Sequence, residues 1–392
     1  MSVLREDATL SLKALDKVCA IREVLHQAGY TDARILPLLG VAEWPAPSQR
    51  RRELPLYLQR TGGQTPLDML VRLFVLREKV PLEAARRAVA PMDLGDWTEV
   101  GLLRLGRRSA WAAVELCPYR GLVVAADWPS RAAPDRDAIM GIAASTRALA
   151  QLTIRRDVIR TLDLGTGGGI QALLAAPHSG QVTAVDCNPR AIAMARFNAQ
   201  LNGVTNIDWG MGNLFEPVDG QKFDLIVCCP PFIIGPGTDY IHSHSGQPTD
   251  QLCRTIIQTA PAHLNQGGYC QVVANWCQLA GEDWKQRLAG WCEGSGCDAW
   301  VLYSHSEDAA AYASARISET VTDRARAARQ FDEWLAYYQR ERVEAIGFGL
   351  ITLRRSTRAP NWFHCETLPR GQSLSGETIS RGFALRDSLQ AV

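Results

Sequence analysis

The stretch Thr161-Leu-Asp-Leu-Gly-Thr-Gly-Gly-Gly-Ile170 decides the fold of this 392-residue chain. An apolar run containing Val158 and Leu162 leads into it, and a helix-like run that ends before Pro177 follows it. Strand, glycine-rich turn and helix in this order place a ligand at a helix N-terminus, where backbone N–H groups are unpaired. Glycine lets the turn approach that ligand closely because it has no Cβ.

The glycine spacing separates this turn from the dinucleotide-binding fingerprint. That fingerprint, G-x-G-x-x-G, places its third glycine where this chain has Ile170. What stands here is Asp163-x-Gly165-x-Gly167-x-Gly169, with an acid two residues ahead of the first glycine. A glycine-rich surface turn would also explain the loop taken alone, so its meaning depends on the strands that follow.

The composition is that of a globular protein with room for two or three domains. Hydrophobic residues make up 46% of the chain and charged residues 21%, and the net charge is +1. No apolar run reaches the length of a membrane span, and the start, Met1-Ser-Val-Leu-Arg-Glu-Asp7, lacks the apolar core of a signal peptide. We therefore expect a cytoplasmic protein without a membrane partner. The first 150 residues hold 21 Lys and Arg against 17 Asp and Glu, which permits a nucleic-acid partner without requiring one.

Eleven cysteines raise the question of a metal site or of disulfides. No Cys-x-x-Cys pair occurs, and the closest spacings match no zinc site. His242-x-His244 followed by Cys253 could be drawn as a metal cluster, but a solvated loop is the simpler interpretation. We expect no metal, and cysteines that serve as small core residues.

Residues 1–128 indicate a helical module. Apolar residues recur at helical spacing up to Gly29, and Thr65 and Pro81 begin two further helices. Residues 42–55 hold three prolines and the triplet Arg50-Arg51-Arg52, and we expect a solvated loop there.

The module ends in a winged-helix-like order. A helix over 94–105 precedes two extended runs, 112–116 and 122–126, which predict a hairpin. Such a module can grip nucleic acid, but it can equally act as a dimerisation piece or as a substrate lid. The sequence leaves these roles open, including that of a homodimer.

Downstream, strand and helix patterns alternate, which predicts a doubly wound, mostly parallel sheet covered on both faces. A linker over 129–137 leads into a helix over 138–152. We expect this helix to carry Met140, Gly141 and Thr146 over the ligand site.

This second domain is expected to span 138–355. A closing strand pair lies at 300–304 and 346–353, and a helical insertion over 307–342 separates its two strands. Residues 356–392 form a weakly patterned C-terminal extension.

The predicted strands end on residues that suit one ligand, and in an open parallel sheet these ends share one edge. The second strand ends on Asp186, an acid that can hydrogen-bond both ribose hydroxyls, and Asn188 caps the next helix. Asn213 and Leu214 follow the third strand, where an adenine would lie between an amide and an apolar side chain. The fourth strand ends in Cys229-Pro230-Pro231-Phe232, beside the expected point of reaction.

Together these motifs resemble a class I S-adenosylmethionine-dependent methyltransferase, from about residue 138 to 304 and over the strand at 346–353. Within that superfamily the chain resembles the small-domain branch, which holds the release-factor glutamine methyltransferases and the ribosomal-RNA guanine amino-methyltransferases. The motifs that carry the resemblance are Asp163-Leu-Gly-Thr-Gly-Gly-Gly169, Val185-Asp186, Gly212-Asn213-Leu-Phe215 and Phe223-Asp-Leu-Ile-Val-Cys-Cys-Pro-Pro-Phe232. The resemblance implies a Rossmann-like α/β fold with a seven-stranded sheet, here preceded by the helical, winged-helix-like domain.

The resemblance also implies S-adenosyl-L-methionine as the cofactor. In the family the glycines contact its methionine part, the acid matching Asp186 holds the ribose, and the residue matching Asn213 lies near the adenine. The implied cofactor-binding residues are Asp163, Gly165, Thr166, Gly167, Gly169, Asp186, Asn188, Asn213, Leu214 and Cys229.

The family's fourth motif, Asn-Pro-Pro-Tyr/Phe, holds a planar nitrogen between hydrogen-bond acceptors and an aromatic ring. Here Cys229 stands in the Asn position, and a thiol is a poor acceptor, so one hydrogen bond is weakened or lost. The backbone carbonyls of Cys229 and Pro230 and the ring of Phe232 remain. The expected catalytic residues are therefore Cys229, Pro230, Pro231 and Phe232, with no base nearby in sequence that would make the thiol a nucleophile.

Further residues are expected to contact the methyl acceptor. They are Phe232, Asp239, His242, His244, Asp250 and Trp276. The polar members could orient the acceptor or act as a base, although surface residues of a lid would show the same pattern. Trp276 could stack on the acceptor or pack in the core.

The sequence therefore predicts an enzyme that methylates a nitrogen of a macromolecule, either a base amine of ribosomal or transfer RNA or a protein glutamine amide. Two alternatives stay open. A methyltransferase for a small molecule or a peptide natural product is favoured by Cys229 and by the weak basic charge. A non-catalytic cofactor- or nucleic-acid-binding protein would have lost activity through Cys229.

Overall fold

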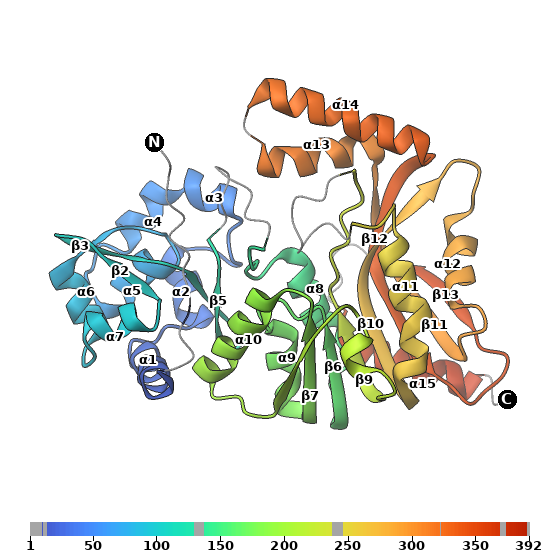
Figure 1. Ribbon diagram of the computed structural model, residues 1–392, viewed down its shortest axis with the longest axis horizontal. Helices are drawn as coiled ribbons and strands as arrows, with labels where there is room; N and C mark the ends of the chain where they lie inside the picture. Colours follow the sequence, from blue (N-terminus) through green and yellow to red (C-terminus); the bar gives the residue numbers. More distant parts are fainter. Residues whose placement is uncertain are drawn as a thin grey trace.

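A computed structural model describes residue 10 and residues 14–128, 137–236, 246–321, 323–368 and 374–389 of the chain. These residues form a central eight-stranded sheet with the order β13-β11-β12-β10-β9-β6-β7-β8. Helices cover both faces of the sheet, and a mainly helical N-terminal region lies beside α10 (Figure 1). The chain thus has the predicted α/β, Rossmann-like architecture.

Five consecutive strands run parallel: β6 (Val158–Leu164), β7 (Ser179–Asp186), β8 (Ile207–Met211), β9 (Phe223–Cys228) and β10 (Leu264–Leu279). The predicted closing pair is present as β11 (Cys297–Asp308) and β12 (Val343–Arg355), which run antiparallel to each other. The helices of this part are α8 (Ala144–Leu152), α9 (Ile170–Ala175), α10 (Pro189–Asn202), α11 (Gln251–Thr259), α12 (Trp284–Cys292), α13 (Ala309–Thr320), α14 (Arg324–Arg340) and α15 (Gly376–Leu389).

Alternate side chains of β9 show how the two faces of the sheet are buried. Leu225 and Val227 pack in a cluster with residues of α8 and α15. Ile226 and Cys228 point to the other face, where they pack with residues of α11 and α12. A strand buried on both faces is typical of a parallel sheet between two helical layers.

The N-terminal region combines seven helices with two small sheets among its described residues. Its elements are α1 (Leu15–Gln27), α2 (Asp32–Leu39), α3 (Pro47–Arg52), α4 (Leu54–Arg60), α5 (Pro66–Phe74), α6 (Leu82–Val89), α7 (Leu94–Glu99), β1 (Val80–Pro81), β2 (Leu103–Leu105), β3 (Ser109–Ala112), β4 (Glu115–Tyr119) and β5 (Leu122–Ala126). The predicted hairpin exists as β4 and β5. The predicted helix over 94–105 is wrong in its second half, because β2 pairs there with β3.

The prediction of a loop over 42–55 is also wrong. Helix α3 begins at Pro47, where the fixed φ of proline suits the first helical turn. Arg50 of this helix donates to the carbonyl of Val75 (3.1 Å) and pairs with Glu115 of β4. These distant partners stabilise a short helix that no local pattern predicts.

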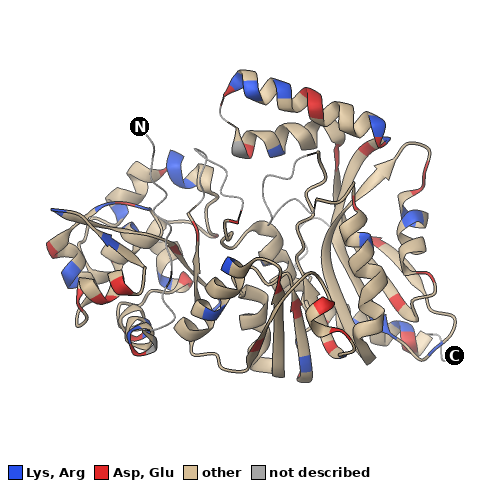
Figure 2. Cartoon of the chain, viewed as in Figure 1, with Lys and Arg blue, Asp and Glu red and all other residues tan. Residues whose placement is uncertain are grey.

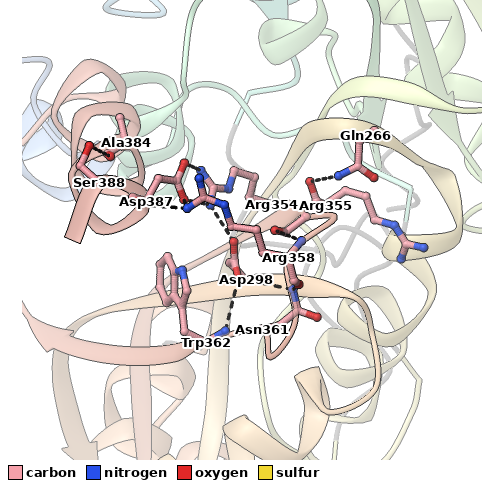
Figure 3. Close-up of polar contacts among 11 residues, drawn as sticks. Gln266, Asp298, Arg354, Arg355, Arg358, Asn361, Trp362, Ala384, Asp387 and Ser388 are labelled. Atoms are coloured by element: carbon pink, nitrogen blue, oxygen red, sulfur yellow. Dashed lines mark hydrogen bonds and ion pairs between the residues drawn. The ribbon is translucent and has the colours of Figure 1, made fainter. Parts of the chain in front are cut away.

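The C-terminal extension supplies an eighth strand, one more than predicted. Strand β13 (Phe363–Thr367) runs parallel to β11 at the edge of the sheet. Figure 3 shows how α15 is attached: Arg354 of β12 donates two hydrogen bonds to Asp387 (2.7 and 2.6 Å) and one to Asp298 of β11 (2.7 Å). The hydrogen bonds from Arg354 lower the pKa of Asp387.

The helical insertion before β12 is the helix pair α13 and α14, which projects above the carboxyl edge of the sheet (Figure 1). Among the helices of the described ranges, none combines the length and the apolar character needed to cross a bilayer.

Candidate active site

The carboxyl ends of β6, β7, β8 and β9 open into one cavity with a volume of about 1910 Å³. The N-terminal region, the start of α8 and the α13–α14 pair supply its other walls. Pockets for small ligands usually measure roughly 300–1,000 Å³, so this cavity has room for a cofactor and for part of a second substrate.

Most residues singled out in the sequence lie on the walls of this cavity. They are Asp163, Gly165, Thr166, Gly167, Asp186, Asn188, Asn213, Leu214, Cys229, Pro230, Pro231 and Phe232. Met140, Gly141 and Thr146 also line it, but the predicted helix over 138–152 is wrong in its first six residues, because α8 begins at Ala144 and only Thr146 lies on it. Four separate strand ends therefore meet at one cavity.

The glycine-rich loop is shaped by its backbone. The amides of Gly165 and Thr166 both donate to the carbonyl of Val185 (2.9 Å each), which ties the loop to β7. A Cβ on Gly167 would meet no atom within 4 Å, so this position leaves space open toward the cavity. Gly169 differs: it is not among the described lining residues, and a Cβ there would lie 2.9 Å from that of Ala195. Its role is close packing of the loop on α10.

Asp163 acts inside the loop. Its carboxylate accepts hydrogen bonds from the hydroxyl of Thr166 (2.6 Å) and from the amide of Ala172 (2.9 Å), and the residue is 1% exposed. Burial raises the pKa of Asp163 to about 7, against the hydrogen bonds that lower it. Asp163 thus fixes the loop to the start of α9.

Asp186 ends β7 on the cavity wall. One carboxylate oxygen accepts from the amide of Gly167 (2.8 Å) and the other from the amide of Asn188 (2.9 Å). A carboxylate has about four acceptor positions, so both oxygens can still accept from a pair of ligand hydroxyls. Burial raises the pKa of Asp186.

Of the other predicted cofactor residues, Asn188 caps a helix, and Asn213 and Leu214 form part of the cavity wall. The side chain of Asn188 caps α10 by accepting from the amide of Arg190 (2.9 Å), and it donates to the carbonyl of Asp137 (3.1 Å). Asn213 and Leu214 line the cavity after the edge strand β8. Leu214 has a φ of 49°. A left-handed leucine is uncommon and is typical of a backbone shaped for a site.

Cys229 follows β9, which is three strands away from β8 and the Asn213 loop in the sheet. Burial raises the pKa of its thiol to about 11, and the thiol shares a hydrogen bond with Ser145. The thiol therefore stays protonated at neutral pH, which argues against a nucleophilic role.

The helical insertion holds both described ends of the loop that follows Phe232. The amide of Ile234 donates to the hydroxyl of Tyr312 (3.4 Å), and the hydroxyl of Tyr338 donates to the carbonyl of Ile234 (2.8 Å). Further along, the amide of Thr249 donates to the hydroxyl of Tyr337 (2.8 Å). Helices α13 and α14 thus position the segment that carries the proline pair.

Two residues predicted to contact the acceptor are structural instead. Asp250 is 3% exposed and is bound by both Nη atoms of Arg287 (2.6 Å each) and by the amide of Cys277 (2.7 Å). Trp276 is fully buried and stacks on Trp284, with ring centroids 5.5 Å apart. Neither is among the described residues that line the cavity.

The remaining acceptor candidates cannot be placed in the same way. Asp239, His242 and His244 lie outside the described residues. Their roles stay predictions.

The structure brings a row of side chains to the cavity that the sequence did not assemble. Asn275, Phe348 and His305 are paired directly across β10, β12 and β11, and all three line the cavity. The rings of His305 and Phe348 stack with centroids 4.4 Å apart. Asn275 lies on β10 at the same edge as the other strand-end residues, but only the pairing of strands far apart in sequence brings Phe348 and His305 beside it.

Charges around the cavity are mixed in sign. On the N-terminal wall, Arg50 pairs with Glu115, and Arg190 pairs with Asp127 (3.1 Å). Figure 2 shows basic and acidic residues interspersed along α14, across the opening. The charge pattern therefore favours neither an RNA nor a protein acceptor.

Two family profiles match separate parts of the chain. Residues 140–287 match the methyltransferase small domain, and residues 27–114 match a domain of unknown function, DUF7059. The mostly parallel sheet and the glycine-rich loop after β6 place the chain in the class of Rossmann-like methyltransferase folds. Within that class, residues 140–287 are the part of the chain that is similar to the methyltransferase small domain.

Part of the chain is similar to three relatives with methyltransferase names. A release factor glutamine methyltransferase of Geobacter sulfurreducens is 33% identical over 143 residues, which is 32% of this chain and 50% of the relative. A ribosomal RNA small subunit methyltransferase C of Salmonella arizonae is 34% identical over 119 residues, 30% of this chain and 31% of the relative. A putative protein N5-glutamine methyltransferase of Methanocaldococcus jannaschii is 32% identical over 128 residues, 31% of this chain and 63% of the relative. The chain spans half the length of the first of these, so activity and substrates are not transferred with the match.

Proposed function

We propose that this protein transfers a methyl group from S-adenosylmethionine to a nitrogen of a macromolecule, an RNA base amine or a protein glutamine amide. The observation that carries the proposal is the meeting of four strand-end motifs on one cavity. The small-domain match and relatives named for protein glutamine and ribosomal RNA methylation support the same activity.

The residues present fit the cofactor. Gly167 leaves space for close approach, and Asp186 keeps acceptor capacity for ribose hydroxyls. Asn213 and Leu214 offer a wall for the adenine. When bound, S-adenosylmethionine supplies a methyl group activated by a positively charged sulfur.

The chain's own part in the chemistry is positioning. The carbonyls of Cys229 and Pro230 accept hydrogen bonds from the acceptor N–H groups, and the ring of Phe232 stacks on the plane of the acceptor. With the cofactor bound, the nitrogen lone pair held there would form the new N–C bond, and the electron pair of the broken C–S bond would stay on sulfur. The N–H proton leaves to solvent water in the open cleft.

The size of the cavity supports a macromolecular acceptor over a small one. Residues of the N-terminal region, such as Trp44 and Arg51, share its lining with Arg326 of α14. An acceptor seated against Phe232 could therefore extend between the two regions.

The test measures cofactor binding first and transfer second. Calorimetry with S-adenosylmethionine should show one site on the native chain. Transfer of a radiolabelled methyl group to ribosomal RNA or to a glutamine-containing release factor should then follow. Failure of the native chain to bind S-adenosylmethionine would overturn the proposal.

A substitution of Cys229 tests the acceptor atom. Cys229→Asn restores the amide that the family motif has, so transfer to a nitrogen acceptor should be preserved or rise. Asn supplies an oxygen acceptor that the neutral thiol lacks. A collapse of transfer with cofactor binding intact would instead give the thiol an essential role of its own.

A further inference from the structure

Two asparagines of helix α10 form hydrogen bonds with the backbone of β5, as a neighbouring strand would. The side chain of Asn202 accepts from the amide of Val123 and donates to its carbonyl (2.8 Å each). Asn198 does the same with Ala125, accepting at 2.8 Å and donating at 3.0 Å. Four residues of a helix rise ~6.0 Å and two residues of a strand ~6.6 Å, so the two spacings match. The edge of the N-terminal hairpin is thereby bound to the methyltransferase fold.

Asn198 makes one contact that Asn202 lacks. Its amide nitrogen also donates to the carbonyl of Gly168 in the glycine-rich loop (2.8 Å). The corresponding nitrogen of Asn202 donates to the backbone carbonyl of Asn198 within α10 (2.7 Å). Asn198 is fully buried, and a Cβ on Gly168 would lie 3.6 Å from its amide nitrogen and 3.8 Å from the carbonyl of Ala125. Loop, helix and hairpin therefore meet at this single side chain.

The end of the same hairpin is also tied beside Asp186. Asp127, just after β5, pairs with Arg190 (3.1 Å) and accepts from the amide of Ile139 (2.7 Å). Arg190 donates in turn to the carbonyl of Asp137, which also accepts from Asn188. The N-terminal region thus contacts both parts of the expected cofactor site, and these contacts run through buried or half-buried polar groups.

We propose that Asn198 is a positioning residue through which the N-terminal hairpin sets the glycine-rich loop for the cofactor. The inference rests on the proposed function. Holding the Gly168 carbonyl and Ala125 with one amide couples the loop to β5, so a cofactor that orders the loop also orders the hairpin. Loss of the Asn198 side chain removes the donor from the half-buried carbonyl of Gly168, which disfavours the loop conformation that binds.

The matched pair Asn198→Ala and Asn202→Ala tests the proposal in the full chain. Each variant loses both hydrogen bonds to β5, but only Asn198→Ala loses the contact to Gly168. Titration calorimetry with S-adenosylhomocysteine should show an affinity about tenfold or more lower for Asn198→Ala. The affinity of Asn202→Ala should stay within about threefold of that of the native chain, because this variant keeps the hydrogen bond from Asn198 to Gly168.

Hydrogen exchange on the native chain gives a second measurement that needs no variant. Saturation with S-adenosylhomocysteine should slow exchange of the Ala125 amide in β5, and not only that of the loop amides. Equal affinities for the two variants, or exchange in β5 that ignores the ligand, would overturn the proposal. If the native chain binds no ligand, the proposed function falls and takes this inference with it, whereas binding by the native chain with matched losses in both variants removes the inference alone.

Discussion

The two ends of the cavity are built differently. At the cofactor end, contacts among the strand-end motifs define the loop: Thr166 donates to Asp163, three residues before it, and the amide of Gly167 donates to Asp186 at the end of β7. At the acceptor end, Tyr312 and Tyr338 of an inserted helix pair bind Ile234, three residues after the proline pair. The cofactor end is thus built from strand-end motifs that the sequence displays, whereas the acceptor end also depends on the helix pair α13 and α14 inserted between β11 and β12.

Breaking the buried ion pair of Asp250 should give the largest effect and should spare the cofactor end. Asp250→Asn leaves Arg287 buried without its carboxylate, so the free energy of unfolding in urea should fall by about 3–5 kcal/mol. The exposed Asp332→Asn on α14 is the matched control, with little expected change. Retained stability with weakened acceptor binding would instead restore Asp250 as a substrate residue.

Removing the carboxylate of Asp186 should act at the cofactor end alone. Asp186→Ala loses charge-assisted hydrogen bonds worth about 1.5–3 kcal/mol, which corresponds to roughly 10–100-fold weaker binding of S-adenosylmethionine. Calorimetry measures it, and Asp208→Ala, an exposed acid on β8, should bind as the native chain does. Unchanged affinity in Asp186→Ala would place the ribose elsewhere.

The protonation of Asp163 sharpens the picture of the cofactor end. Its pKa is raised from 3.8 to about 7, so the folded chain keeps a proton that the unfolded chain loses near pH 4. The contribution of Asp163 to stability is therefore present below pH 4 and is lost as pH rises to about 7, by at most about 1.4 kcal/mol per pH unit. The free energy of urea unfolding should be measured between pH 4 and pH 7 for the native chain and for Asp163→Asn. The difference between the two should show this slope, and a difference that does not change with pH would contradict the raised pKa of Asp163.

The smallest effect is expected at the acceptor end. Tyr338→Phe removes one hydrogen bond to Ile234, so unfolding should become easier by about 0.5–1.5 kcal/mol. Methyl transfer should slow while the affinity for S-adenosylmethionine stays native, because the cofactor end is untouched. Tyr337→Phe, which loses only the contact with Thr249, is the comparison variant. Equal losses of cofactor affinity in both variants would show that the two ends are not independent.

The sequence predicted well the elements whose signals are local. Asn188 and Gly203 mark the ends of α10, and the structure confirms both caps. The strand before the glycine-rich loop and its helix also follow from adjacent residues. Such elements carry their own boundary chemistry.

The failures share a dependence on distant partners. Helix α3 needs Glu115, and β13 forms a strand only because β11 offers its edge. The sequence predicted Asp250 to be an acceptor-contacting acid near a loop because its partner, Arg287, lies 37 residues further along the chain. Residues at the acceptor end are set by such long-range contacts, so the sequence located that end without identifying its members.

The central claim is that the carboxyl edge of the sheet holds the nucleoside with its sulfur directed at the proline pair. A crystal structure of the chain with S-adenosylhomocysteine measures this most directly. We expect ribose hydroxyls on the carboxylate of Asp186, the adenine beside Leu214 and the sulfur facing the ring of Phe232. A ligand bound elsewhere, or turned so that its sulfur faces away from Phe232, would contradict it.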